Sequence, residues 1–304
     1  MTQQGPEDNM TIAYQTEKGR LLKGYSENIL PLLRRDWSGK IDLIITSPPF
    51  PLNRKKKYGN LQGPEYIDWL AEFAPVFKSL VKPTGSIVIE VGNAWEPGRP
   101  VMSTLSLKAL LAFQERADLQ LCQQFVIYNP ARLPSPAQWV NVERIRVKDA
   151  YTHVWWLSPS DRPKADNRRV AKEYSPAMLK LLETRKYNAG PRPSEHHIGK
   201  DSFLTNNGGA IPPNVITMAN TGAGDQYQRY CKRHAINPHP ARMRTDLVSW
   251  FIRFLTDPGD MVVDPFAGSN TTGYVAESMG RRWIAIEPEQ EYIDGSRGRF
   301  WPDE

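Results

Sequence analysis

The sequence predicts an α/β protein with a mainly parallel sheet that is covered by helices on both faces. Seven short aliphatic segments each stop at loop-forming residues, as buried strands do: residues 20–24, 41–46, 85–92, 123–128, 151–158, 261–264 and 282–287. Apolar residues recur at helical spacing between several of them, in residues 65–81, 104–117 and 244–256. Strands that alternate with helices favour parallel pairing, because each return of the chain crosses over through a helix.

Composition limits the class of protein. The 304 residues are 24% charged and 40% hydrophobic, which is typical of an ordinary globular chain of one large domain, or of one domain with a sizeable insertion. The net charge of +6 favours a polyanionic partner. Cys122 and Cys231 lie far apart without a CxxC motif, so we interpret both as structural and expect a reducing compartment. The polar, acidic first ten residues and the lack of a long apolar run predict a cytoplasmic enzyme without a signal peptide or membrane span.

One region breaks the alternation of strands and helices. Residues 159–230 are rich in Pro, Gly, Asn, Lys and Arg, a composition that alone would allow a disordered linker. The region nevertheless holds spaced apolar anchors, namely Tyr174, Leu179, Leu182, Tyr187, Phe203 and Ile211. We therefore expect an irregular, mostly ordered insert with a basic surface, and a division into residues 1–158, 159–232 and 233–304.

A ligand-binding turn is predicted after residues 261–264. Asp264 stands at the tip of that strand, and a helix begins near Thr271, whose free N–H groups and positive dipole end suit a ligand. Gly268 allows close approach of the backbone. Glu287 ends another strand about 20 residues later and can accept hydrogen bonds from two ribose hydroxyls. This half resembles a nucleoside-binding half of a Rossmann-like sheet, without the motifs of triphosphate or NAD sites.

A second strand ends in Thr46-Ser47-Pro48-Pro49-Phe50. The two prolines cannot extend a ladder and hold the backbone in a fixed shape, which places the Ser47 hydroxyl and the Pro48 carbonyl in space. Both groups can accept a hydrogen bond from an NH2 group, and the Phe50 ring can stack on a base. The lone pair of a planar exocyclic amine is delocalised into the ring. Hydrogen bonds that pull on its hydrogens let the nitrogen become pyramidal and attack an electrophile.

These two motifs together resemble the DNA amino-methyltransferases. In that family the motif at Ser47-Pro48-Pro49-Phe50 is catalytic, and the motif that begins at Asp264-Pro265-Phe266 binds S-adenosylmethionine. The catalytic motif comes first, as in the circularly permuted beta class. The resemblance implies a Rossmann-like class I methyltransferase fold with a mixed, mostly parallel, seven-stranded sheet and a target-recognition insert at 159–232. It also implies a prokaryotic, nucleoid-associated enzyme of a restriction–modification system or an orphan methylase.

The resemblance also assigns cofactor-binding residues. Residues 237–252 resemble the segment that binds the methionine part of the cofactor. The full expected set is Thr46, His239, Asp264, Phe266, Ala267, Gly268, Ser269, Asn270, Thr271, Thr272 and Glu287. One departure concerns Gly24-Tyr25-Ser26-Glu27, where the family often has Gly-Asp that reaches the adenine amine of the cofactor. Ser26, Glu27 or another loop takes that place.

The type of target follows from the first residue of the catalytic motif. In the family, Ser-Pro-Pro is usually associated with the N4 amine of cytosine, and Asp- or Asn-Pro-Pro with the N6 amine of adenine. Carbon-5 methylation of cytosine needs a nucleophilic cysteine, typically after proline, whereas Cys122 follows Leu121 and Cys231 follows Tyr230. Three alternatives stay open: adenine-N6 methylation of DNA, methylation of a protein amide nitrogen, and a non-catalytic DNA-binding protein on the same scaffold.

Double-stranded DNA is the expected partner, and the target base has to leave the helix to reach such a pocket. The residues expected to contact DNA are polar or basic: Arg54, Lys55, Lys56, Lys57, Arg168, Arg169, Arg192, Lys200, Asn206 and Asn207. No metal is expected, because methyl transfer from a sulfonium needs none and His196-His197 has no acid or cysteine at ligand spacing. A cognate endonuclease and a monomeric or homodimeric state are both left open.

Overall fold

The structure is a computed structural model that describes residues 10–50, 63–218 and 224–303. The chain forms two compact units. The first unit contains the residues up to Lys164 and those from Asn214 onward, and the second contains Ala165–Pro213. The second unit lies within the insert that was expected at 159–232.

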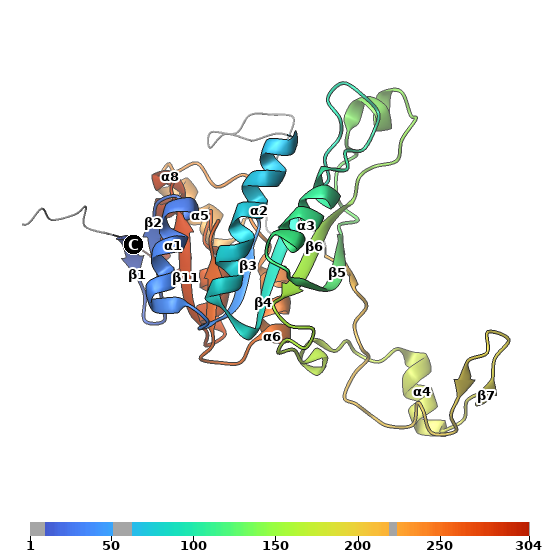
Figure 1. The fold of residues 1–304 in the computed structure, drawn as a ribbon. Coiled ribbons are helices and arrows are strands. Elements are labelled where there is room, and N and C mark those ends of the chain that lie inside the picture. Colours follow the sequence, from blue (N-terminus) through green and yellow to red (C-terminus); the bar gives the residue numbers. More distant parts are fainter. Residues whose placement is uncertain (1–9, 51–62, 219–223, 304) are drawn as a thin grey trace, which may run out of the picture. The chain divides into compact units, whose positions relative to one another are not determined.

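A mixed sheet of nine strands runs through the first unit in the order β1-β2-β11-β10-β3-β4-β6-β5-β9 (Figure 1). The five neighbouring strands β2, β11, β10, β3 and β4 all pair in parallel, whereas β6 is antiparallel to both β4 and β5. Their bounds are β1 Thr11–Gln15, β2 Gly19–Lys23, β3 Ile41–Thr46, β4 Val81–Val91, β5 Gln120–Tyr128, β6 Tyr151–Ser158, β9 Val215–Thr217, β10 Met261–Asp264 and β11 Arg282–Glu287. The predicted α/β fold is thereby confirmed.

The expected number of seven strands was wrong. All seven predicted strands are present, and two short strands extend the sheet at its edges. β1 has five residues of which only Tyr14 is buried, and β9 has three residues, so neither produces the continuous aliphatic run by which the buried strands were recognised. β9 also belongs to the first unit, although it lies within the stretch 159–232.

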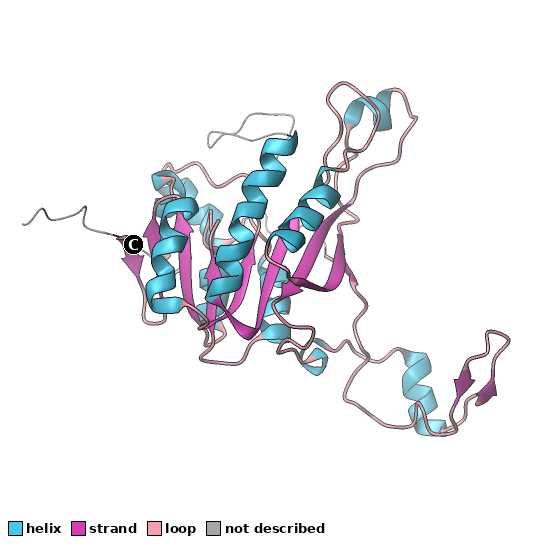
Figure 2. Ribbon diagram, viewed as in Figure 1, coloured by secondary structure: helices cyan, strands magenta, loops and turns pink. Residues whose placement is uncertain are grey.

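Helices cover both faces of the sheet, as Figure 2 shows. On one face α1 (Ser26–Trp37), α2 (Gly63–Leu80) and α3 (Leu105–Arg116) pack over the main apolar core, where the rings of Phe77 and Phe113 meet at 5.8 Å. On the other face Phe251 of α6 (Thr245–Leu255) meets Phe125 of β5 edge-on at 5.2 Å. The remaining helices of this unit are α5 Gln226–Arg233, α7 Thr271–Ser278 and α8 Gln290–Arg297. Within the described ranges, no helix has both the length and the apolar content needed to cross a membrane.

The three helices predicted from periodicity are confirmed as α2, α3 and α6, with bounds that differ by one or two residues. Their buried residues follow the helical repeat, which is why the pattern was visible in the sequence. β3 is buried at every position, as expected for a central parallel strand. Its one acid, Asp42, accepts hydrogen bonds from the Lys82 ammonium at 2.6 Å and the Met261 N–H at 3.0 Å, so this buried charge is paired.

The direction of the strands decides where a site can form. The carboxyl ends of β2, β11, β10, β3 and β4 meet at one edge of the sheet because these strands are parallel. β5 ends at the same edge, since β6 is antiparallel to both of its neighbours. Ligands of open α/β sheets bind at this edge.

The second unit is irregular but ordered. It contains a 3-10 turn at Asn167–Val170, the helix α4 (Pro176–Thr184) and a two-residue hairpin of β7 (Gly190–Pro191) and β8 (His197–Ile198). Ser175 caps α4 by accepting a hydrogen bond from the Met178 N–H at 3.2 Å. The rings of Tyr187 and Phe203, two of the predicted anchors, meet edge-on at 5.5 Å.

Candidate active site

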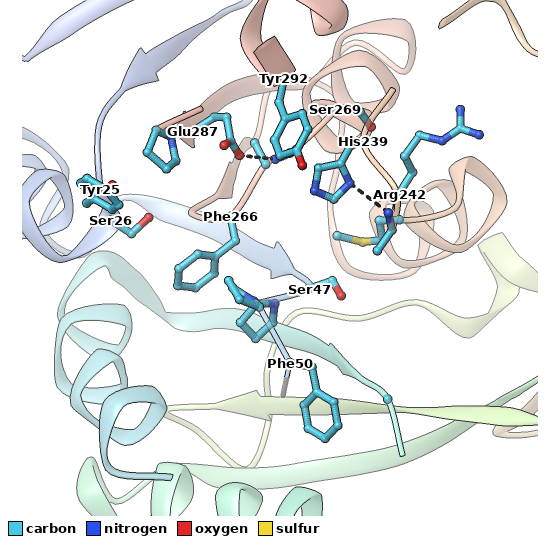
Figure 3. A pocket seen from close by; sticks show the side chains of 18 of the residues that line it. Tyr25, Ser26, Ser47, Phe50, His239, Arg242, Phe266, Ser269, Glu287 and Tyr292 are labelled. Carbon is cyan, nitrogen blue, oxygen red and sulfur yellow. Dashed lines mark hydrogen bonds between the residues drawn. The ribbon is translucent and has the colours of Figure 1, made fainter. Parts of the chain in front are cut away.

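A cavity of about 400 Å3 opens at the carboxyl edge of the sheet (Figure 3). It brings together the two motifs singled out in the sequence and the segment around His239. Of the predicted residues, those that line it are Ser47, Pro48, Pro49, Phe50, His239, Phe266, Ala267, Gly268, Ser269 and Glu287. The other lining residues are Tyr25, Ser26, Glu27, Trp69, Gly92, Ala241, Arg242, Met243, Pro288 and Tyr292.

Asp264 joins the two motifs. Its Oδ1 accepts hydrogen bonds from the Thr46 hydroxyl at 2.7 Å and the Phe266 N–H at 3.0 Å, and its Oδ2 accepts one from the Thr272 hydroxyl at 2.6 Å. Burial raises the pKa of this carboxyl group to about 6, against the lowering effect of the three donors. Thr46 and Thr272 are themselves buried, so their part in the site is to hold Asp264 and, through it, the two loops.

The turn after β10 requires a glycine at Gly268. Its φ of +52° is in the left-handed region, and a Cβ there would lie 3.0 Å from the Nε2 of His239. The Gly268 N–H donates to the Glu287 carboxylate at 2.7 Å, and the Ala267 N–H donates to the Ile286 carbonyl at 3.0 Å. The backbone of the turn is therefore fixed against β11 and presents its surface to the cavity.

Asn270 works inside the fold. The residue is fully buried with φ +49°, and its Oδ1 caps α7 by accepting a hydrogen bond from the Gly273 N–H at 3.0 Å. Its Nδ2 donates to the Tyr14 hydroxyl at 2.9 Å. Asn270, Thr271 and Thr272 were predicted to contact a cofactor, whereas the structure places their side chains beneath the turn.

Arg299 is a residue that the sequence analysis missed. Its guanidinium donates to the Ser269 carbonyl at 2.6 Å, the Ser269 hydroxyl at 3.1 Å and the Thr271 hydroxyl at 3.0 Å. The cation also lies 4.7 Å from the centre of the Tyr227 ring. Arg299, which follows α8, therefore holds the turn in place through these hydrogen bonds. The sequence around residue 299 gives no sign of this role, because Ser269 lies 30 positions away.

Glu287 faces the cavity at the end of β11. Its carboxylate accepts hydrogen bonds from the N–H groups of Gly268 at 2.7 Å and Glu289 at 3.0 Å. Burial raises the pKa of Glu287 to about 7, with smaller contributions in the same direction from Glu289 and Asp264. An ionised carboxylate has capacity for further donors, so Glu287 can accept from ligand hydroxyls.

The Ser47 segment leaves the sheet next to Asp264. Thr46 is the last paired residue of β3, and the Ser47 and Phe50 side chains are half-buried at the cavity wall. The Phe50 ring meets Tyr66 edge-on at 5.5 Å, so its orientation is fixed from behind. On the other wall, Phe266 packs against Trp69 with ring centres 5.5 Å apart.

Glu90 is a second residue that the sequence analysis did not single out. Ile89 pairs with Thr46 and belongs to the core, so Glu90 follows at the same level as Ser47 and points to the opposite face from Ile89. Burial raises the pKa of Glu90, whose carboxylate accepts a hydrogen bond from the Thr152 hydroxyl at 3.1 Å. The sequence could have indicated this residue, because Glu90 is an acid within the apolar run of β4. This carboxyl group adds a hydrogen-bonding group at the strand end beside Ser47.

Residues 25–27, where the sequence departs from the family's usual Gly-Asp, also line the cavity. The Ser26 hydroxyl donates to the Pro265 carbonyl, so it is used within the fold. One Glu27 carboxylate oxygen accepts from the Trp69 indole N–H at 2.7 Å, which leaves the other oxygen to a ligand. Of the two candidates at this position, Glu27 is therefore better placed to meet an adenine amine.

His239 is held at the rim of the cavity. Its backbone N–H donates to the Tyr227 hydroxyl at 2.9 Å, and its ring Nδ1 accepts from the Ala241 N–H at 3.3 Å. Its ring meets Tyr292 edge-on with centres 4.4 Å apart. These contacts fix the imidazole against Gly268, which explains why that glycine has no room for a side chain.

The predicted DNA-contacting residues fall in two groups. Arg54, Lys55, Lys56 and Lys57 lie outside the described residues. In the second unit Arg168 pairs with Asp166 at 2.8 Å, and Arg192 donates to the Asn188 carbonyl at 2.8 Å. The Asn206 side chain accepts from the Gly208 N–H at 2.9 Å and so closes its own turn, while Arg169, Lys200 and Asn207 are exposed.

The sheet and its cavity define a Rossmann-like protein with the motif order of an amino-methyltransferase. Residues 41–297 match the model of the N6/N4 DNA methylase family, and the chain belongs to that family. The predicted family is thereby confirmed.

Named relatives agree with this assignment. The chain is 45% identical to the type II methyltransferase M.PvuII of Proteus hauseri, over 95% of this chain and 85% of the relative. It is 25% identical to M.BglII of Bacillus subtilis, over 91% of this chain and 68% of the relative.

Two solved structures extend the comparison. The PvuII DNA methyltransferase, described as cytosine-N4-specific, superimposes with a TM-score of 0.75 at 38% identity and covers 95% of this chain and 88% of its own. The complex of M1.HpyAVI with SAM superimposes with a TM-score of 0.52 at 18% identity, over 92% and 98% of the two chains, and shows the shared fold.

Replacement of Asn270 tests whether the turn depends on this buried side chain. We expect Asn270→Ala to lower the free energy of unfolding by about 2–4 kcal/mol, because it removes a cap and places alanine in the left-handed region. Asn270→Gly should cost about 1 kcal/mol less, since glycine adopts this conformation without a Cβ clash. Denaturation with guanidinium measures both. Equal stability of the two variants and the original protein would contradict the structural role.

Proposed function

We propose that this chain transfers a methyl group from S-adenosylmethionine to the exocyclic N4 amine of a flipped cytosine in double-stranded DNA. The observation that carries the proposal is the joining of Ser47-Pro48-Pro49-Phe50 to the turn at 265–270 through the bonds of Asp264, in one cavity. The choice of cytosine is supported by the serine at position 47 and by the 45% identity to a relative whose structure is described as cytosine-N4-specific.

The residues at the cavity fit the cofactor. When bound, S-adenosylmethionine supplies an electrophilic methyl group on a sulfonium. Glu287 accepts hydrogen bonds from the ribose hydroxyls, and the backbone at Gly268 allows close approach because no side chain occupies that space. Phe266 provides an apolar face for the adenine ring, and His239 stands where the resemblance places the methionine segment. Glu27 is the candidate partner of the adenine amine.

Catalysis rests on position and hydrogen bonding. The Ser47 hydroxyl and the Pro48 carbonyl accept from the two hydrogens of the amine, which lets the nitrogen attack and stabilises the positive charge that develops on it. Phe50 stacks on the flipped base, a contact worth about 1–3 kcal/mol. The edge-on contact with Tyr66 fixes this ring before the base arrives, so little has to be reordered during binding.

DNA is held by cations in this proposal. Arg54, Lys55, Lys56 and Lys57 follow the catalytic segment directly and are proposed to contact phosphates. In the second unit Arg168 is 79% exposed, although it shares its charge with Asp166. The relative M.PvuII is named a type II methyltransferase, and we extend this to the proposal that the chain is the modification enzyme of a restriction–modification system.

Nucleoside mass spectrometry tests the reaction itself. We expect N4-methylcytosine after unmethylated DNA is incubated with the protein and S-adenosylmethionine. N6-methyladenine instead would retain the fold and overturn the choice of base. The absence of any methylated nucleoside would overturn the proposed activity, and calorimetry with S-adenosylmethionine would then show whether the cofactor binds at all.

Ser47→Ala should lower turnover by about a hundredfold or more, because one of two acceptors for the amine is lost. The affinity for S-adenosylmethionine should stay within about twofold, since the cofactor contacts other walls of the cavity. Ser278→Ala, at an exposed serine, is the matched control. Unchanged turnover of Ser47→Ala would exclude this role for the hydroxyl.

Cofactor affinity should rise with pH up to about 7. Burial raises the folded-state pKa of Glu287 to about 7, so at lower pH the free protein holds a proton that must leave before the carboxylate can accept two hydroxyls. We expect the affinity to fall by up to about tenfold per pH unit below 7. Calorimetry from pH 5.5 to 8 measures it.

Glu287→Gln is the control for the pH dependence. It should bind the cofactor more weakly at pH 8 and lose most of the dependence, whereas a dependence that came from Asp264 would persist in this variant. A flat profile in the original protein would show that the ionised Glu287 is not required.

A further inference from the structure

Two loops at the carboxyl edge of the sheet form a structure that the proposed function does not use. Residues 93–103 follow β4, and residues 129–149 connect β5 to β6 and contain a short π-helix at Gln138–Val142. We call these two stretches the arm. The arm belongs to the first compact unit and is visible in Figure 1 at the far end of β5 and β6, beside α3.

The arm has an interior of its own. The rings of Trp95 and Trp139 pack with centres 5.5 Å apart, and the buried Asn93 amide donates to the Asp149 carboxylate at 2.7 Å. The Trp139 carbonyl accepts from two N–H groups, those of Ile145 at 2.9 Å and Arg146 at 3.2 Å. The contacts of Trp95 with Trp139 and of Asn93 with Asp149 tie the two loops together, and the Trp139 carbonyl fixes the second loop internally, so the surface they present is preorganised.

That surface exposes apolar side chains. Val147 is 87% exposed and Leu133 is 81% exposed, which are the two largest values among the large apolar residues of the described chain. Four more exposed apolar side chains lie on the arm: Val101, Met102, Val142 and Ile145. Single exposed apolar residues are ordinary, but six on one small element indicate a surface that meets a partner.

The arm also carries a net positive charge. The arm contains five cations against three acids, and one of those acids, Asp149, is buried against Asn93. Within the described ranges no cation of the arm pairs with a carboxylate. The Arg146 guanidinium donates to the Pro100 carbonyl at 3.0 Å, and the Lys148 ammonium donates to the Pro130 carbonyl at 2.8 Å. Carbonyl partners position these side chains but leave their charge for an anion.

The arm and the cavity lie at the same edge of the sheet. It leaves the sheet at the carboxyl ends of β4 and β5, and β4 is the neighbour of β3, which ends at Ser47. A polyanion that delivers a base to Ser47 therefore passes along the edge from which the arm rises. Continuity with the catalytic edge and charge complementarity both select duplex DNA as the partner.

We propose that the arm is a DNA-contacting wall, in which the cations bind phosphates and Leu133 and Val147 press between bases next to the flipped cytosine. Apolar wedges of this kind stabilise an unstacked step and fill the space that the base leaves. The inference rests on the proposed function, because it assumes that a base is flipped from DNA into the cavity.

The proposed contacts between the arm's cations and phosphates are tested by measuring DNA binding, which does not require methyl transfer. The double variant R99A/R144A removes two exposed cations for which the structure shows no side-chain bond. We expect weaker binding of a fluorescent 30-base-pair duplex of any sequence, and a slope of log Kd against log salt that is smaller by about one for each lost phosphate contact. The matched control R35A/R116A removes two exposed cations at the opposite edge of the sheet and should leave the slope unchanged. Equal slopes in all three proteins would overturn this part.

The wedge part is tested by turnover on a duplex that carries a site mapped by sequencing of methylated DNA. L133A/V147A should reduce turnover by about tenfold with unchanged affinity for S-adenosylmethionine, and a duplex with an abasic position opposite the target should restore it, because flipping then costs less. The control L107A/L111A removes two half-exposed side chains of α3 and should behave as the original protein. A merely structural defect would not be rescued by a change in the DNA.

Other outcomes separate the hypotheses. Full turnover of L133A/V147A on the paired duplex would overturn the wedge. A dimer of the original protein in sedimentation that L133A/V147A converts to a monomer would assign the surface to a second copy of this chain and overturn the proposal. If the original protein methylates no base, the proposed function fails, whereas the salt slope still decides whether the arm binds DNA.

Discussion

The site depends on one buried carboxylate. Asp264 accepts three hydrogen bonds, and each donor belongs to a different segment of the chain: the end of β3, the turn after β10 and the first turn of α7. An isolated charge in this position would be costly, and these bonds offset part of the loss of water. The distance between the Ser47 segment and the turn at residues 265–270 is therefore fixed by the fold itself, before any ligand binds.

The turn held by Asp264 is rigid because its polar groups are satisfied from beneath. Asn270 fills the left-handed position and caps α7, and Arg299 occupies the acceptors of Ser269 and Thr271. Few side chains of the turn are left to contact a ligand, and in the proposed function its backbone and the space above Gly268 therefore take most of that part. This explains why a motif rich in serine, asparagine and threonine adds few polar side chains to the cavity, whose lining carboxylates are Glu27 and Glu287.

Sequence patterns predicted the parts of this site that are local. A buried strand that ends in Ser47-Pro48-Pro49-Phe50, or in Asp264 before a glycine turn, is visible within ten residues. The sequence did not show which side chains point inward: Asn270 and Thr272 were expected to meet the cofactor, and both lie beneath the turn. Nor could it reveal Arg299 or Tyr14, since Tyr14 bonds to Ser296 across 282 positions. The edge strands were missed because they are too short to show a period.

The cavity is rigid, and residues 165–213 pack as a compact unit of their own, so the two can vary independently. In the proposed mechanism, chemistry on the amine requires Ser47 and Pro48 to keep the geometry that Asp264 fixes, so variation there would be costly for any target sequence. Residues 165–213 form their own compact unit, and the arm packs mainly on itself through Trp95 and Trp139. Changes on either surface leave the bonds of Asp264 untouched. In the proposed mechanism one catalytic edge can therefore serve different DNA sites, because the elements proposed to meet the duplex are built apart from the elements proposed to hold the amine.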